Sequence, residues 1–406
     1  MKNFITIIFI LVFSVSNAQN IPILQHKNVE ITKLDVLNSP YRETNISISP
    51  DGRYLYFFSS RGGQSWSYPN YSIYNGKYQY DGDIWCSEKK RGKWQKPVCL
   101  DKTINTSIGE DEPNISPDGQ YLIFQSWRYD YENRPYYISK KTGSKWSEPK
   151  RFGKNISLFF RNESWATATD GMSISPDGKK FIVACGNDYD GYLNFYFSKK
   201  TKERWSYPKP MSINTTKDER SIFIAGDGQT IFFASSGYGG YGGLDIFKAN
   251  IDENGKCSNI TNIGKPFNTE KDDLGFIITA SGKEAYFVRN GDIYYANLID
   301  IDKNLIPNPT VIVSGKIYDC NKKPVETSLE LINIDKNMVS GTSKTDAKTG
   351  EYSIVLPEQS GNYKIVDTKK NKTLKKFKIE KKNTYQKIKF DIEIKCPNSA
   401  AGGRRS

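Results

Sequence analysis

The chain has 406 residues, a formal net charge of +13 and a single histidine. This length allows one large domain and one small domain. Tyrosine is abundant (26) and methionine scarce (4), and short breaks rich in Gly, Pro, Asn and Asp separate short apolar runs. The composition argues against a helical enzyme and predicts an all-β protein.

The first residues predict export. Lys2 is followed by an apolar run from Phe4 to Val15 and then by Ser16-Asn17-Ala18. This order is typical of a secretory signal peptide over residues 1–18, cleaved after Ala18. The run is too short to span a bilayer, and no later segment is apolar enough to cross as a helix. We therefore expect an exported protein, periplasmic or outer-membrane-associated, with no transmembrane segment in the mature chain.

An internal repeat organises residues 27–301. An alternating strand ends in Ser-Pro-Asp-Gly, where Pro suits the second and Gly the fourth position of a type I turn. A second apolar strand follows, then a loop of variable length, a third strand and a fourth strand carrying Trp94, Trp146 or Trp205. The turn glycines are Gly52, Gly119, Gly178, Gly228 and, in a degenerate copy, Gly282.

Four antiparallel strands per repeat predict the blades of a β-propeller. We count five blades, with six as the alternative if a long insertion hides another. The fifth unit stops after its third strand, near Leu298. The segment Val29–Leu37 is therefore expected to supply the missing fourth strand and to close the ring.

The pattern changes after Ile301. Residues 302–310, with Pro307 and Pro309, read as a linker, and residues 311–395 contain short alternating strands that predict a small immunoglobulin- or transthyretin-like β-sandwich. Residues 396–406 differ in composition and read as a disordered tail or a cloning artefact. Six cysteines in an exported chain could pair, but their spacing does not fix the connectivity.

The Ser-Pro-Asp-Gly repeats resemble the WD-like repeats of TolB-type propellers. Gly315-Lys-Ile-Tyr-Asp319, Lys323-Pro-Val325 and Gly350-Glu-Tyr352 resemble the carboxypeptidase regulatory-like domain. The two domains in this order resemble Bacteroidota envelope proteins of the OmpA family, here without the OmpA C-terminal domain. The resemblance implies a protein-interaction platform in the cell envelope, linked in some members to the type nine secretion apparatus.

The sequence gives little sign of catalysis. A Ser-His-Asp triad needs a histidine at the reacting centre, but His26 precedes the propeller, and no G-x-S-x-G motif occurs. A single histidine also excludes a His-rich metal site. We therefore expect no enzyme, catalytic residue, metal site or cofactor. Two-carboxylate glycosidase chemistry stays open, although the acids repeated before each first strand favour a structural role: Glu43, Glu110, Glu219 and Asp273.

Aromatic residues concentrate in the loops between the second and third strands, which share one face of the ring. Exposed Tyr and Trp favour binding and suit stacking on sugar rings; alternatively, the long loops bury their own aromatics. The expected binding residues are Trp66, Tyr68, Tyr71, Tyr74, Tyr78, Trp127, Tyr129, Tyr131, Tyr189, Tyr192, Tyr238 and Tyr241.

The leading functional interpretation is an exported scaffold that binds an envelope protein or peptide, and the family resemblance links it to an outer-membrane or type nine secretion assembly. The alternative is a carbohydrate-binding or glycoside-acting propeller. Between Val311 and Lys395 there are 18 Lys and 11 acidic residues. This excess is either a solvated face or a surface for anionic envelope material; nucleic acid is not expected as a partner of an exported protein.

Overall fold

A computed structural model describes residues 21–63, 69–74, 77–80, 82–126, 135–187, 191–202, 204–357 and 360–394. The predicted signal peptide and the predicted tail lie outside the described residues. The described residues are all-β apart from one short α-helix, α1 (Lys154–Asn162), and one 3₁₀ turn, η1 (Lys303–Leu305). No helix among the described residues is long and apolar enough to cross a membrane.

Within the described residues, the N-terminal part contains five antiparallel sheets of four or five strands each and one separate two-stranded sheet. The five sheets are numbered here by their innermost strands, β2 (Glu43–Ile48), β9 (Glu110–Ile115), β14 (Ala168–Ile174), β19 (Glu219–Ile224) and β23 (Asp273–Ile278). Sheet 1 also contains β3 (Tyr54–Ser59), β6 (Asp83–Lys90), β7 (Lys93–Trp94) and β8 (Val98–Cys99), and sheet 2 contains β10 (Tyr121–Ser126), β11 (Tyr136–Thr142), β12 (Lys145–Trp146) and β13 (Lys150–Arg151). Sheet 3 also contains β15 (Lys180–Gly186), β16 (Leu193–Thr201), β17 (Arg204–Trp205) and β18 (Lys209–Pro210). Sheet 4 adds β20 (Thr230–Ser235), β21 (Asp245–Ile251) and β22 (Cys257–Asn262), and sheet 5 adds β24 (Glu284–Arg289) and β25 (Asp292–Asn297).

The five sheets form a closed ring, because each innermost strand contacts the innermost strands of both neighbouring sheets and β2 contacts β23. The ring is closed by β1 (Ile31–Lys33), which pairs antiparallel with β25 and places Ile31 opposite Ala296. The predicted closure by the N-terminal segment is confirmed. It removes an open edge from the last sheet.

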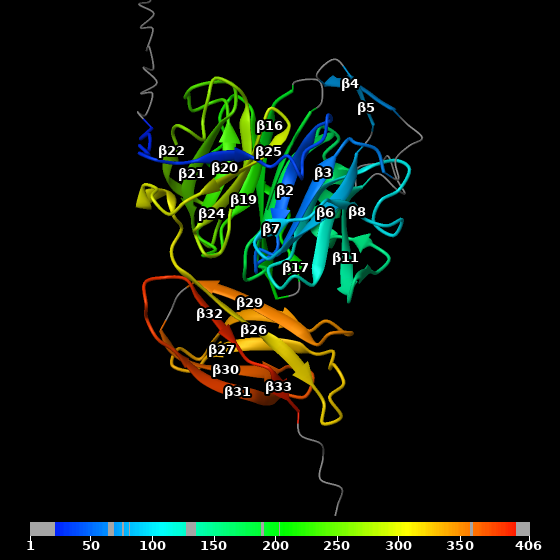
Figure 1. Cartoon of the computed structure of the whole chain (residues 1–406), viewed down its shortest axis with the longest axis vertical. Helices are drawn as coiled ribbons and strands as arrows, with labels where there is room; N and C mark the ends of the chain where they lie inside the picture. The colour runs from blue at the N-terminus through cyan, green and yellow to red at the C-terminus, as the bar shows by residue number, and fades with distance from the viewer. Residues whose placement is uncertain are drawn as a thin grey trace, which may run out of the picture.

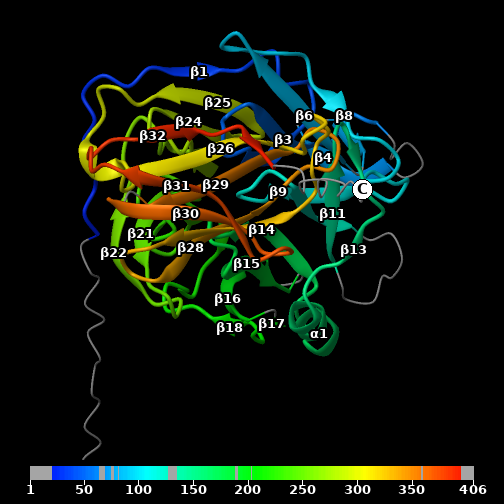
Figure 2. The same cartoon turned by 90° about the horizontal axis from the view of Figure 1, so that it is seen from below.

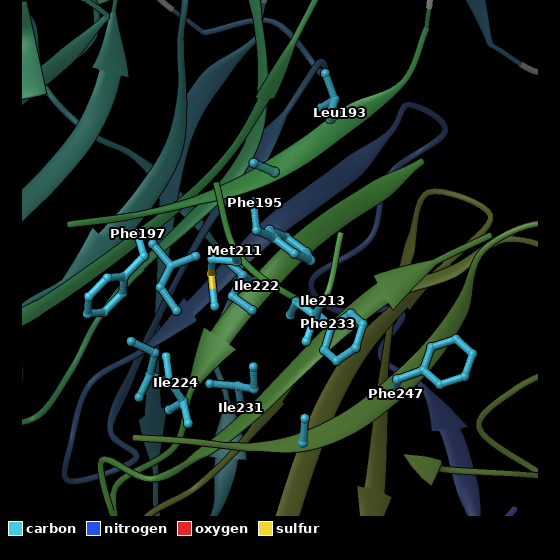
Figure 3. Packing of buried hydrophobic residues seen from close by; sticks show 14 residues of the cluster. Leu193, Phe195, Phe197, Met211, Ile213, Ile222, Ile224, Ile231, Phe233 and Phe247 are labelled. Carbon is cyan, nitrogen blue, oxygen red and sulfur yellow. The ribbon is translucent and has the colours of Figure 1, made fainter. Parts of the chain in front are cut away.

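Apolar side chains fill the spaces between neighbouring sheets. Between sheets 3 and 4, Phe195 and Phe233 meet edge to face at 5.7 Å, and Phe233 stacks on Phe247 (Figure 3). Two tryptophans of the fourth strands also pack between sheets: Trp94 contacts Tyr286 of sheet 5, and Trp146 contacts Tyr56 of sheet 1.

A recurring asparagine ties each of four sheets to the link that follows it. Asn268 Oδ1 accepts from the amide of Ile246, and its Nδ2 donates to the carbonyl of the same residue. Asn38 binds Ile293 in the same way, which fixes the closing segment to the last sheet. Satisfying both backbone groups stabilises a buried link that no strand covers. Asn105 and Asn214 repeat the arrangement.

The C-terminal part has two sheets around one core. The inner sheet contains β26 (Thr310–Tyr318), β29 (Glu351–Pro357), β32 (Gln386–Lys389) and β33 (Ile392–Glu393); the outer sheet contains β27 (Ser328–Asn333), β28 (Met338–Lys344), β30 (Gly361–Asp367) and β31 (Lys372–Ile379). Val311, Ile354, Leu331 and Tyr363 lie in this core, so side chains from both sheets contribute to it. Cys320 is disulfide-bonded.

The C-terminal part covers the end of the ring that carries the Ser-Pro-Asp-Gly turns (Figures 1 and 2). The Lys344 amide donates to Asp118 at 3.1 Å, and the Gly143 amide donates to Asp346 at 2.7 Å. Val355 lines the same small cavity as the ends of the innermost strands. The opposite end, where the two-stranded β4 (Pro69–Tyr74)–β5 (Lys77–Tyr80) sheet lies, is not covered by the C-terminal part and is called the mouth of the ring (Figure 1).

Candidate functional site at the mouth of the ring

The acids repeated at the start of the innermost strands are structural. Glu110 is 2 % exposed and accepts from the Thr106 amide and hydroxyl and from Ser126 Oγ. Glu219 repeats these contacts with Thr215 and Ser235. Glu43 also forms an ion pair with Arg61, and Asp273 forms one with Arg289. Since these contacts recur around the ring, the structural role expected for the four acids is supported.

Directly after this position, every innermost strand contains a β-bulge. Asn45, Glu112, Ser221 and Gly275 have φ of 48°, 51°, 53° and 65°. In sheet 3 the left-handed residue is Gly171, where an added Cβ would lie 2.8 Å from Ser221 Cα. The bulges turn consecutive side chains toward the ring axis and the mouth.

Glu112 is the unusual residue in this set. A left-handed conformation at a residue with a side chain costs about 1–3 kcal/mol and clusters at functional sites. Its side chain is 2 % exposed and accepts from Tyr136 Oη at 2.5 Å and from Thr169 Oγ1 at 2.6 Å. Burial, together with the negative charge of Asp111, raises the pKa of Glu112 to about 8. Glu112 is therefore a protonated carboxyl at neutral pH.

Asp111 is less enclosed than Glu112 and lies beside it. Its carboxylate accepts from Asn45 Nδ2 at 2.9 Å and from the Glu112 amide at 2.6 Å. Burial raises the pKa of Asp111 to about 6, although both hydrogen bonds oppose the shift. A carboxyl that titrates near pH 6 can both donate and accept a proton under mild conditions.

Asp170 supplies a third carboxylate. Asp170 directly follows Thr169, whose hydroxyl donates to Glu112, and its charge raises the pKa of both Asp111 and Glu112. Asp170 pairs with Arg220 at 2.9 Å, and the same guanidinium pairs with Asp218 at 2.5 Å. The three carboxyls thus differ in environment: one is buried, one is half-enclosed, and one is held in an ion pair. In sites that use two carboxyl groups, different environments make one group the proton donor and the other the base.

One predicted binding residue lies next to this cluster. Arg220 donates to the Gly191 carbonyl at 3.2 Å, and Asp218 accepts from the Leu193 amide at 2.8 Å. Tyr192 lies between Gly191 and Leu193 in the sequence. It is 47 % exposed, and Lys217 Nζ lies 5.9 Å from the centre of its ring. An exposed aromatic ring therefore lies on the loop that contacts Arg220, the partner of Asp170.

Below the bulges the ring narrows. A cavity of about 30 Å³ is lined by Glu112, Met172, Ser221 and Ile277 among others. That volume holds a water molecule but not a sugar ring. Ser221 Oγ is buried there and has no hydrogen-bond partner among the described residues. A ligand of sugar size would stay above this constriction, at Asp111 and Asp170.

The other predicted binding residues differ in their surroundings. Tyr238 packs against Phe233 and Phe247 and donates to the Ile213 carbonyl, so this residue follows the self-packing alternative. Tyr241 is half-buried beneath Lys265. Tyr71, Tyr74 and Tyr78 lie on β4 and β5, but their side chains are not described. Trp66, Tyr68, Trp127, Tyr129, Tyr131 and Tyr189 lie outside the described residues.

His26 contacts the link that follows sheet 4. Its Nε2 contacts the Ile263 carbonyl at 2.7 Å, and its ring meets Phe267 edge to face. Among the described residues, no group of three or more His, Cys, Asp and Glu could hold a metal ion.

No protein-family model matches the chain, and neither does any curated protein. Solved structures do resemble it. The catalytic domain of the GH62 α-L-arabinofuranosidase of Coprinopsis cinerea aligns over 67% of this chain and 97% of that one, at 10% identity and a TM-score of 0.45. Zg3597, a family 117 glycoside hydrolase of Zobellia galactanivorans, aligns over 70% and 94%, at 12% identity and a TM-score of 0.42.

The gluconolactonase XC5397 of Xanthomonas campestris aligns over 70% of this chain and 95% of that one, at 9% identity and a TM-score of 0.36. The expectation that the chain is not an enzyme is contradicted by these comparisons, since all three structures are enzymes. At such identities the likeness concerns the β-propeller fold and names no substrate. None of the three is a TolB-type or OmpA-family protein, so that resemblance stays a prediction.

Proposed function

We propose that the ring is a five-bladed β-propeller capped by a β-sandwich, and that its open mouth acts on glycosides in an exported protein. The observation that carries the proposal is a pair of neighbouring carboxyls in different environments, Asp111 and Asp170, with the exposed Tyr192 on the loop that contacts the Arg220 partner of Asp170. Glycoside hydrolysis requires two carboxyl groups and neither a metal ion nor a histidine. Aromatic rings beside such a pair suit the apolar face of a sugar.

Each residue has a distinct role in this proposal. Asp111, with its pKa near 6, transfers the proton to or from the glycosidic oxygen. Asp170, oriented by Arg220, provides the second carboxylate. Glu112 lines the cavity that is too small for a sugar, so it acts as a buried neighbour: it accepts from Thr169 and its pKa is coupled to the charge of Asp111. Tyr192 stacks on the bound sugar.

The test is hydrolysis of a panel of chromogenic aryl glycosides by the mature chain. Asp111→Asn and Asp170→Asn should each lower kcat/KM by about 10²–10⁴-fold, the usual contribution of one acid–base group. Tyr192→Ala should mainly raise KM. Asp177→Asn is the matched control, because Asp177 lies in a Ser-Pro-Asp-Gly turn at the covered end and bonds Ser175. The proposal fails if no glycoside is cleaved and no glycan is bound, or if both Asn variants keep the wild-type rate.

The second candidate function is the envelope scaffold expected from the sequence. The exposed Tyr192 with its neighbouring Lys217 favours it, because an aromatic ring with a nearby cation also suits a peptide. The same variants separate the two candidates. A scaffold loses partner capture with Tyr192→Ala and keeps it with Asp111→Asn and Asp170→Asn.

A further inference from the structure

The positive charge of the C-terminal part is concentrated in one stretch. Residues 361–389 contain 11 lysines and only two acidic residues, Asp367 and Glu380. Asp367 is 1 % exposed and is used internally, where it accepts from Thr327 Oγ1 and from the Lys369 amide. Almost all of the exposed charge of this stretch is therefore positive.

The geometry of β30 and β31 places part of this charge on the outer side of the outer sheet. Tyr363 and Ile365 point into the core, so Lys364 points away from it. Lys364 lies directly opposite Lys376, and Lys378 lies opposite Asn362. The inner sheet lies against the ring (Figure 1), and β28 of the outer sheet contacts the ring at its last residue, Lys344. The three lysines thus face away from the propeller.

This arrangement costs stability in the isolated chain. Like charges directly opposite on one sheet face are destabilising. The nearby acids do not offset the pair: Glu330 lies opposite Val366, Asp335 bonds Asn362, and Glu380 pairs with Lys378. The fold itself therefore gives no reason for the Lys364–Lys376 pair.

An apolar patch lies at the end of the same sheet. Ile332 lies opposite Val339, and both are partly exposed. Beyond them, at the β27–β28 turn, Ile334 is 41 % exposed and Met338 is 50 % exposed. Together these four apolar residues and Lys364, Lys376 and Lys378 are called the basic face.

We propose that the basic face docks the protein on the surface of a bilayer that contains anionic lipids. Lysines near such a surface are attracted by its negative potential, and exposed apolar side chains beside them can enter the headgroup layer. The patch of Ile334 and Met338 favours a lipid surface over a dissolved polyanion, which offers nothing apolar to bury. Docking by this face points the open mouth away from the membrane. The proposal does not depend on the glycoside activity.

The test is co-sedimentation of the mature chain with vesicles of phosphatidylcholine alone and with vesicles that also contain phosphatidylglycerol. Binding is expected only to the anionic vesicles and should fall with salt. The triple variant Lys364→Gln, Lys376→Gln, Lys378→Gln should bind about a hundredfold more weakly, since each lysine contributes a factor of about five. Ile334→Ser with Met338→Ser should also weaken binding.

The matched control replaces three exposed lysines of the ring, Lys93, Lys145 and Lys150, by Gln and should bind as the wild type does. Circular dichroism checks that every variant is folded. Equal loss in the control would mean that net charge alone is sensed. Binding of heparin by both the wild type and the Ile334–Met338 variant, without vesicle binding, would assign the face to a soluble polyanion. Either result, or no binding to any vesicle, overturns the proposal.

Discussion

Glu112→Gln is expected to make the protein more stable than the wild type above pH 8, although it removes a hydrogen-bonded side chain. The pKa of Glu112 is raised from 4.5 to about 8 in the folded chain. Between these values the folded state keeps a proton that the unfolded state has lost. The stabilising contribution is thus complete below about pH 4.5 and is lost as the pH rises to about 8. Glutamine mimics the protonated group at every pH.

The measurement is thermal unfolding of both proteins from pH 5 to pH 8.5. The two should unfold at similar temperatures at pH 5, and the variant should gain a few kcal/mol over the wild type at pH 8.5. Glu148→Gln, at an exposed position of the ring, is the control and should leave the pH dependence unchanged. Parallel curves for the wild type and Glu112→Gln would show that Glu112 titrates normally and would remove the electrostatic basis of the site.

Deletion of residues 29–37 is expected to abolish cooperative unfolding of the ring. The deletion removes β1 and leaves unpaired the backbone groups of β25 that face β1, while the pairing with β24 remains. It also removes Leu37, which is fully buried in the cluster between sheets 1 and 5. An open ring exposes this cluster and a strand edge at once, and it has no alternative partner for either.

Circular dichroism and thermal unfolding provide the measurement for this deletion. A synthetic peptide of residues 27–40, added in trans, should restore a cooperative transition, because it carries both β1 and the Asn38 side chain that binds Ile293. Rescue distinguishes loss of the closing strand from a general defect of the shortened chain. An unchanged melting temperature without the peptide would show that the ring does not need β1.

The repeat made much of the ring predictable. Turn chemistry is local, so the Ser-Pro-Asp-Gly segments locate the hairpins directly. The missing fourth strand after Leu298 pointed to the N-terminal segment, which β1 confirms. Sheet 3 departs from the repeat: it carries Ala168 where the other sheets carry an acid, and α1 precedes it. Sequence reasoning gave no reason to expect this helix, whose buried face packs only against tertiary neighbours such as Trp205.

The carboxyl cluster was missed because its members come from different repeats. Asp111 and Glu112 follow the structural Glu110, whereas Asp170 and Arg220 lie in the next two sheets. A signal was present: the second unit has three consecutive acids where the others have one. Interpreting it required the bulge, which turns two of the three side chains away from the structural position. Their pKa values depend on burial, which no local pattern predicts.

For the aromatic loops, the sequence predicted the location but not the exposure of the rings. Composition and topology placed these residues on one face, but they could not separate exposed rings from buried ones. Tyr192 is exposed beside Asp218, whereas Tyr238, in the equivalent loop of the next sheet, fills the core. The difference arises because the Tyr238 ring packs against Phe233 and Phe247. These two residues are distant in sequence from Tyr192.

The most direct test of acid–base chemistry at the mouth is the titration of its carboxyls, which requires no knowledge of the substrate. Nuclear magnetic resonance of the protein labelled at Asp and Glu carboxyl carbons would follow them, with Asp111→Asn and Glu112→Gln for assignment. We expect one carboxyl to titrate near pH 6 and a second near pH 8, and we expect Asp111→Asn to lower the second midpoint because it removes a neighbouring negative charge. Midpoints near 4 for both groups would contradict the account.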